Sequence, residues 1–194
     1  MSTPDSVPPF GRRVAQIAAD AVGGDASVHS YRTDDEQTSI SVLTCTSAPG
    51  DGWMTCSTVN LHVVSNLLDG VDVRVELMVS GRQEDEAVAS LVATSAFFVM
   101  ANGWLAAPGV VFPRLVAEYF PMTSTPHLMW VEPFPYPELS TVQIDGLGAV
   151  HWLMGVPISE DERGLLLERG FDTLDARLNE ANVEYYDFWR PSSV

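Results

Sequence analysis

The stretch AVHWLMGVPISEDERGLLLERG, residues 149–170, shows more about the fold than any other part of this chain. Its first eight residues, 149–156, form a nearly unbroken apolar run, which is typical of a strand covered on both faces. Pro157 follows and lacks the backbone N–H group that a strand donates to its neighbour. We therefore expect strand pairing to end at Pro157.

The second half of the same stretch predicts a well-capped helix. Ser159 stands three residues before Glu162, the spacing of a capping box, in which a hydroxyl and a carboxylate satisfy free N–H groups at a helix start. The acids at 160–162 fall in the first turn, where the helix dipole favours negative charge. Leu165–Leu167 would supply the buried stripe, and Gly170 would end the helix.

Outward from this stretch, periodicity and turn residues predict the other elements. The patterns indicate strands at 28–32, 39–46, 53–64, 70–80, 127–131 and 140–144, and helices at 12–22, 85–105, after the turn at 108–109, and over 171–181. In 70–80, valine and leucine alternate with mostly polar residues, which predicts one buried face and one solvent face. Strands grouped before and after a helical middle indicate an α+β fold. We expect a mixed, mostly antiparallel sheet with helices packed against it.

Length and composition predict a single domain. The 194 residues are 46% hydrophobic, enough to bury one sizeable core. Residues 1–10 are polar and contain prolines, so we expect a flexible lead there and one domain over 11–194.

The chain is strongly acidic. Ten arginines and no lysine stand against 26 aspartates and glutamates, a formal net charge of −16. Such a surface repels nucleic-acid phosphate, so we expect neither DNA nor RNA as a partner. Charge of this sign either steers a basic protein partner toward the surface or serves only to keep the protein in solution.

Two segments indicate the cellular location of the protein. Residues 1–9 do not show the charged start and apolar run of a secretory signal. Residues 87–113 contain no charged side chain, but Asn102, Gly103 and Pro108 interrupt them, and the uninterrupted part is shorter than the roughly 20 residues that a bilayer requires. We expect a buried core helix there, no membrane contact and a cytoplasmic protein.

The two cysteines, Cys45 and Cys56, flank a turn-forming cluster at 49–52 and would lie nearly opposite each other in a hairpin. In a protein without a visible export signal, two such thiols indicate reduced residues. A cross-strand disulfide is the alternative.

The sequence lacks the common catalytic motifs, including a glycine-rich phosphate loop, a Gly-x-Ser-x-Gly elbow and a His-Glu-x-x-His helix. None of His29, His62, His127 and His151 pairs with another at metal-ligand spacing. His62 could approach a cysteine across the hairpin, but no residue pattern orients such a pair. We expect no catalysis, no metal and no cofactor.

A binding surface is the remaining candidate for function. The alternate prolines of 133–137 stiffen the backbone that carries Phe134 and Tyr136, so little entropy would be lost on docking. These aromatic residues either contact a partner or cover the edge of the core. The partner-binding residues that we predict are Asp34, Asp35, Glu36, Glu132, Phe134, Tyr136 and Glu138.

Four segments together resemble the suppressor of fused (SUFU-like) domain family. They are the segment 53–61 (WMTCSTVNL), in which Asn60 stands where the family has a glycine, the strand 73–77 (VRVEL), the Val156–Ser159 corner with its Glu-rich helix, and the closing Asp187-x-x-Arg190-x-Ser192. The resemblance extends from about Thr38 to Ser193.

This resemblance implies a binding protein rather than an enzyme. The animal member of the family grips an extended peptide by strand addition, and many bacterial members look like immunity proteins of polymorphic toxin systems. A bacterial immunity protein that neutralises a toxin by direct binding is therefore the first hypothesis, and the acidic charge favours a basic toxin domain. A tight complex of this type would bury about 1,200–2,000 Å².

Two other classes stay open. A small-ligand-binding protein or enzyme would use an aromatic and histidine-lined cleft formed by Trp53, His62, Trp130 and His151, and a deep pocket holding a titratable group would indicate it. A structural scaffold would form stable oligomers, which a native mass measurement detects. The sequence leaves the oligomeric state unknown.

Overall fold

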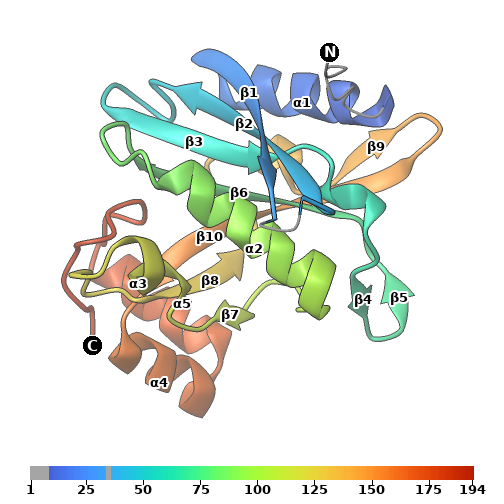
Figure 1. The fold of residues 1–194 in the computed structure, drawn as a ribbon. Helices are drawn as coiled ribbons and strands as arrows, with labels where there is room; N and C mark the ends of the chain where they lie inside the picture. Colours follow the sequence, from blue (N-terminus) through green and yellow to red (C-terminus); the bar gives the residue numbers. More distant parts are fainter. Residues whose placement is uncertain (1–8, 34–35) are drawn as a thin grey trace.

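The computed structural model describes residues 9–33 and 36–194. The strands of the main sheet are β1 (Asp25–Arg32), β2 (Ser39–Thr46), β3 (Trp53–Thr58), β6 (Val75–Arg82), β7 (Val111–Phe112), β8 (His127–Val131), β9 (Val142–Ile144) and β10 (Gly148–Ile158). The two remaining strands, β4 (Leu67–Leu68) and β5 (Val71–Asp72), form a separate hairpin that projects from the body (Figure 1). The helices are α1 (Pro9–Val22), α2 (Val88–Asn102), α3 (Leu115–Tyr119), α4 (Glu160–Arg169) and α5 (Phe171–Glu180), with short 3₁₀ turns at η1 (Leu61–Val63) and η2 (Pro137–Leu139).

The main sheet is mostly antiparallel, as predicted. Its strand order is β1-β2-β3-β6-β10-β8-β7, and β9 pairs with the start of β10. Among the described strands, β6 and β10 form the one parallel pair, in the register Leu77 to Leu153. The fold is therefore α+β, with helices packed on both faces of a mixed sheet.

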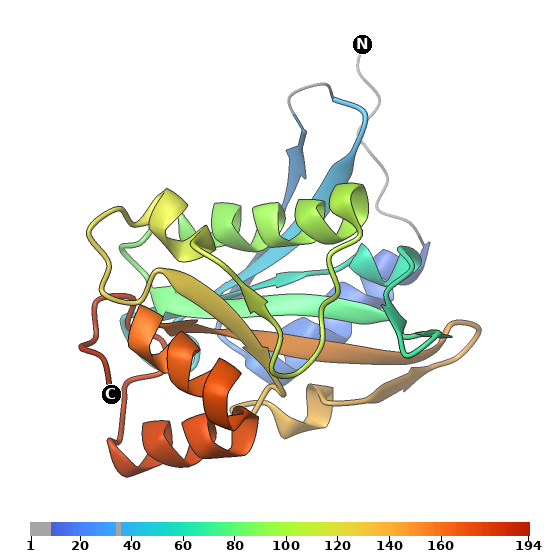
Figure 2. The same ribbon diagram turned by 90° about the horizontal axis from the view of Figure 1, so that it is seen from below.

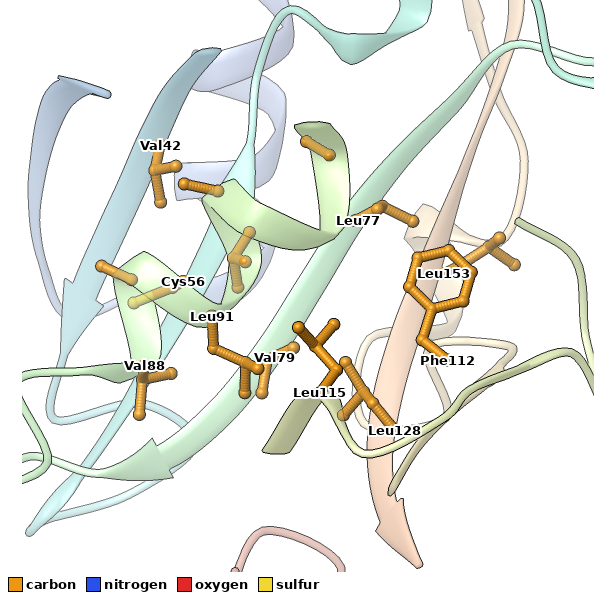
Figure 3. Close-up of a cluster of buried hydrophobic side chains, with 14 of the residues drawn as sticks. Val42, Cys56, Leu77, Val79, Val88, Leu91, Phe112, Leu115, Leu128 and Leu153 are labelled. Carbon is orange, nitrogen blue, oxygen red and sulfur yellow. The ribbon is translucent and has the colours of Figure 1, made fainter. Parts of the chain in front are cut away.

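Helices cover the two faces of the sheet separately (Figure 2). On one face, α2 and α3 pack over a core in which Val79 of β6, Leu91 of α2 and Leu115 of α3 lie together (Figure 3). On the other face, α1, α4 and α5 cover a second core that contains Met78 and Trp152. Alternate residues of β6 thus enter different cores, because successive side chains of a strand point to opposite faces.

The expectation of one solvent face over 70–80 was wrong for β6. Glu76, Met78 and Ser80 are all buried, because this strand lies in the middle of the sheet, with α2 over one face and the second core beneath the other. The predicted strand is also divided: β5 ends at Asp72, and β6 begins at Val75.

Most other predicted elements are present with shifted ends. The strands at 39–46 and 127–131 match β2 and β8, and the charge-free segment 87–113 contains the buried helix α2. The predicted strand 53–64 ends at Thr58 and continues as η1, and Phe112 belongs to β7 rather than to the helix that follows it.

Pro157 does not end strand pairing, contrary to the prediction. Pairing with β6 stops at Gly155, but Pro157 still pairs with Leu128 of β8, and Ile158 pairs with His127. At Pro157, β10 has a strand neighbour on one side only, so the missing N–H group is tolerated there.

The predicted capping box is confirmed. The Ser159 hydroxyl accepts the Glu162 N–H at 3.1 Å, and the Glu162 carboxylate accepts the Ser159 N–H at 2.8 Å. Only part of the predicted leucine stripe is buried, since Leu166 faces the core whereas Leu167 is 71% exposed.

Cys45 and Cys56 point to opposite faces of the sheet. Cys45 pairs in register with Thr55, one residue away from Cys56, and the two thiols belong to different cores. Both cysteines are free, and this geometry does not allow a disulfide between them.

The predicted lead 1–10 lies largely outside the described residues. Of its members, Pro9 and Phe10 belong to α1. Between residues 9 and 33 and from 36 onward, the structure contains no helix with the length and apolar content needed to span a membrane.

Candidate functional site

A surface pocket of about 430 Å³ lies between the end of β8, the loop that follows it, and α5. Its floor is apolar, formed by Met129 and Val131 of β8, Val156 of β10 and Leu178 of α5. Met129 and Val156 lie directly opposite each other in the β8–β10 register. We call this feature the β8–α5 pocket; its remaining lining residues are Pro108, Glu132, Phe134, Phe171, Asp175, Asn179 and Tyr185.

The proline-rich loop forms one wall of the β8–α5 pocket. Two tight turns follow β8: the Phe134 N–H donates to the Glu132 carbonyl, and the Tyr136 N–H donates to the Pro133 carbonyl, both at 2.8 Å. The Tyr136 side chain is 5% exposed, and its hydroxyl lies 3.0 Å from the Thr55 hydroxyl. This buried anchor holds the loop while Phe134 remains 49% exposed.

Helix α5 forms the opposite wall. Phe171, Asp175 and Leu178 are spaced by four and three residues, which places them on one face of the helix. Asn179 lies a turn after Asp175; its amide N–H donates to the Asp175 carboxylate at 3.2 Å, and its amide oxygen accepts the Tyr185 hydroxyl at 3.1 Å. This chain of hydrogen bonds ties the C-terminal segment to α5.

Three aromatic rings meet at the rim of the pocket. The Phe134 and Tyr185 ring centroids are 5.0 Å apart in an edge-to-face arrangement, and Phe134 stacks on Tyr186 at 6.2 Å. Such contacts fix the Phe134 ring although half of its surface is open to solvent.

The charge of the pocket is negative. Glu132 on the loop and Asp175 on α5 both line it, and of the described side chains that do so none is basic. Burial raises the pKa of the Tyr185 hydroxyl, and the negative charge of Asp175 raises it further. Tyr185 is therefore neutral near pH 7 and able to donate its proton to Asn179.

A second groove of about 400 Å³ continues from the β8–α5 pocket. Glu132 and Pro108 line both depressions. The second groove extends past His151 to Leu68 of the β4–β5 hairpin, where Leu67 and Val71 are strongly exposed. Glu132 thus stands at the junction of two surface depressions.

The structure places the predicted binding residues in different regions. Glu132 and Phe134 line the β8–α5 pocket, and Glu138 is exposed nearby on η2. Glu36 is exposed beside β2, whose hairpin with β1 projects past α2, on the opposite face of the sheet from η2 (Figure 2). Asp34 and Asp35 lie outside the described residues.

The residues of the alternative cleft are not gathered in one site. Trp130 is buried in the core beneath α2, and Trp53 packs edge-to-face on Tyr186. His62 is fully buried, with Nδ1 2.6 Å from the Glu76 carboxylate and Nε2 without a hydrogen-bond partner among the described residues, so it does not pair with a cysteine as the sequence suggested. Of the four, His151 lines the second groove. In the described part of the chain, no three His, Cys, Asp or Glu side chains are arranged to hold a metal ion.

Sequence reasoning missed the α5 wall of the pocket. Phe171 was assigned to a core stripe, and Asp175 and Asn179 were not singled out. The available signal was an acid one turn after Phe171 on an amphipathic helix, but no sequence pattern shows that this helix faces the loop 41 residues earlier.

Comparison with solved structures defines the class of fold. A crystal structure of a putative SUFU homologue from Neisseria gonorrhoeae FA 1090 matches with a TM-score of 0.70 and 15% identity, over 95% of this chain and 97% of its own. A crystal structure of the Sufu–Fu complex matches at 0.63 and 11% identity, over 97% and 93% of the two chains. Drosophila Suppressor of Fused matches at 0.63 and 12% identity, over all of this chain and 54% of its own. The molecule therefore has the SUFU fold.

Sequence comparison then gives the family. The model of the Suppressor of fused protein (SUFU) family matches residues 36–191, so the chain belongs to this family and the predicted resemblance is confirmed. Immunity protein YqcF of Bacillus subtilis (strain 168) is 29% identical over 184 residues, which is 93% of this chain and 95% of YqcF.

Proposed function

We propose that this protein is an immunity protein that neutralises a cognate toxin by binding it directly in the cytoplasm, without catalysis. The observation that supports this most is the similarity to Immunity protein YqcF over nearly the full length of both chains. The Sufu–Fu complex shows that another protein with this fold is found with a protein partner. Glu162 and Glu76, whose side chains are fully buried, are occupied in structural hydrogen bonds.

The proposed contact surface includes Glu132, Phe134 and Glu138, around the β8–α5 pocket. Tyr136 supports this surface from beneath, because its ring is buried and its hydroxyl contacts Thr55. Glu36, with Asp34 and Asp35, would form a separate acidic contact. A basic toxin domain is the partner that fits the net charge of −16.

Capture followed by rescue tests this proposal. The tagged protein is isolated from its native host with bound proteins, and each captured protein is expressed alone and with its captor. We expect one captured protein to arrest growth alone and to be harmless when co-expressed. Capture of small metabolites only, or toxicity that co-expression leaves unchanged, would reject the immunity role.

The dependence of the association rate on salt tests the electrostatic part of the proposal separately. Association of the purified pair should slow as ionic strength rises, because salt screens long-range attraction between the acidic surface and a basic partner. An association rate constant that is the same at low and high salt would reject charge steering. It would not contradict direct binding.

Small-ligand binding is the second candidate function, and the volume of the β8–α5 pocket favours it, since ligand pockets commonly enclose about 300–1,000 Å³. Native mass spectrometry of the protein purified from its host checks this candidate. A bound small molecule that Phe134→Ala releases would support it, and a mass equal to that of the bare chain would not.

A further inference from the structure

We propose that the β8–α5 pocket binds an arginine side chain of the protein partner, with the guanidinium between Glu132 and Asp175. This inference rests on the proposed function, because it assumes that the ligand is part of a protein. It adds to that function the chemistry of one central contact.

The charges in the pocket favour a cation. Glu132 and Asp175 come from different elements, and neither takes part in an ion pair with a described basic side chain. Two acids of α4 are used differently: Glu160 pairs with Arg163 and His127, and Glu162 pairs with Arg190. A guanidinium in the pocket would supply the positive charge that these two carboxylates lack.

The walls favour arginine over lysine. A guanidinium is planar and weakly hydrated, and it stacks on aromatic rings, whereas an ammonium is compact and strongly hydrated. Phe134, Tyr185 and Phe171 offer such rings in the same pocket as the two carboxylates. The apolar floor would cover the methylene groups of the stem, as occurs where arginine side chains lie along apolar surfaces.

The pocket is also organised before any ligand enters. Phe134 is held against Tyr185 and Tyr186, and Asn179 connects Asp175 to Tyr185 through hydrogen bonds. Groups that are already fixed lose little conformational entropy on binding, which favours a well-defined anchor site at the centre of an interface.

A capped amino acid tests the inference without a known partner. N-acetyl-arginine methylamide is titrated into methyl-labelled protein, and the methyl signals of Met129, Val131, Val156 and Leu178 on the pocket floor report binding. We expect these signals to shift in a saturable way, while methyl signals of the exposed Leu67 stay unchanged. The neutral citrulline analogue should bind about fivefold more weakly or worse, because it keeps the shape and loses the charge.

Charge-removing variants identify the residues responsible. Glu132→Gln and Asp175→Asn should each weaken binding of the arginine probe about two- to fivefold, and the double variant about tenfold. The matched controls are Asp172→Asn, exposed on the same helix, and Glu118→Gln, exposed on α3; both should bind like the unmodified protein. Equal binding of arginine and citrulline probes, or floor signals that do not move, would overturn the inference.

The failure of this inference can be told apart from the failure of the immunity role. If co-expression rescues growth and the Glu132→Gln/Asp175→Asn variant protects and binds the toxin as well as the unmodified protein does, the arginine anchor is wrong and immunity stands. If the arginine probe binds as expected but no captured protein is neutralised, the immunity role fails instead.

Discussion

Glu162 and Arg190 show how single residues connect distant parts of this chain. The Arg190 guanidinium donates to both carboxylate oxygens of Glu162, at 2.7 and 2.8 Å, and to the Pro157 carbonyl at 2.8 Å. The same carboxylate accepts the N–H groups of Ser159 and Ser193. One buried pair therefore caps α4 and attaches the C-terminal segment to the end of β10.

Removing the Arg190 charge should destabilise the fold strongly. Arg190→Met leaves the Glu162 carboxylate buried and without its cation, and such a loss costs about 3–5 kcal/mol of unfolding free energy. Denaturant unfolding measures the change. The control Arg177→Met removes a long, exposed pair with Glu180 at 3.9 Å and should cost less than about 1 kcal/mol. Equal small losses in both variants would show that the buried pair is dispensable.

The same pair predicts how stability depends on pH. Burial tends to raise the pKa of Glu162, but hydrogen bonds from Arg190 and from the backbone outweigh it, so the pKa of the folded protein is lowered. A lowered pKa adds stability above the unfolded value of about 4.3, and this contribution is lost as the pH falls through the folded pKa. The difference in unfolding free energy between the unmodified protein and Glu162→Gln should therefore be largest near neutral pH and shrink in acid. A difference that grows in acid would contradict this reasoning; Glu168→Gln, on an exposed side chain, is the control.

The cysteine thiols should be inert in the folded protein. Burial raises the pKa of both Cys45 and Cys56 to about 11, so hardly any thiolate exists at neutral pH. Iodoacetamide at pH 7.5 should leave the native protein unmodified and should label both residues after denaturation, as a mass measurement would show. Rapid labelling of Cys56 in the native protein would contradict this prediction and make Cys56 a candidate nucleophile.

At the scale of elements, sequence patterns predicted the features that depend on residues close together in the chain. The capping box at Ser159, the strands over 39–46 and 127–131, and the buried helix within 87–113 follow from spacing and hydrophobicity alone. The prediction of a solvent-exposed face for β6 was wrong. The strand order that places β6 at the centre depends on contacts across the whole chain, which local sequence patterns do not show. Glu132 and Phe134, which line the pocket, were predicted as partner-binding residues from local features, whereas Asp175 joins them only through tertiary packing.

The central strand β10 allows a direct test of this packing. A Cβ atom at Gly155 would lie 2.9 Å from a Leu128 methyl of β8 and 2.9 Å from a Val79 methyl of β6. Gly155→Ala should therefore cost about 1–3 kcal/mol through overpacking. Gly164→Ala on α4 meets nothing within 4 Å and should instead stabilise the helix by up to about 1 kcal/mol. Thermal unfolding compares the two, and a neutral Gly155→Ala would show that the neighbouring strands adapt freely.

At the scale of the whole molecule, the family, the acidic charge and the pocket are the features on which the proposed immunity function rests. A SUFU-family domain with helices on both faces of its sheet carries an acidic pocket, and Phe134 at its rim packs against the half-buried rings of Tyr185 and Tyr186. The described side chains hold no cluster suited to a metal, and the buried His62 is hydrogen-bonded to Glu76.

Titration of toxin activity with the purified protein tests binding without catalysis most directly. The account predicts that inhibition rises linearly and is complete at one molecule per toxin, and that the toxin regains activity, with unchanged mass, once the complex is dissociated. Complete inactivation by a small fraction of an equivalent, or a lasting change in the mass of the toxin, would contradict it.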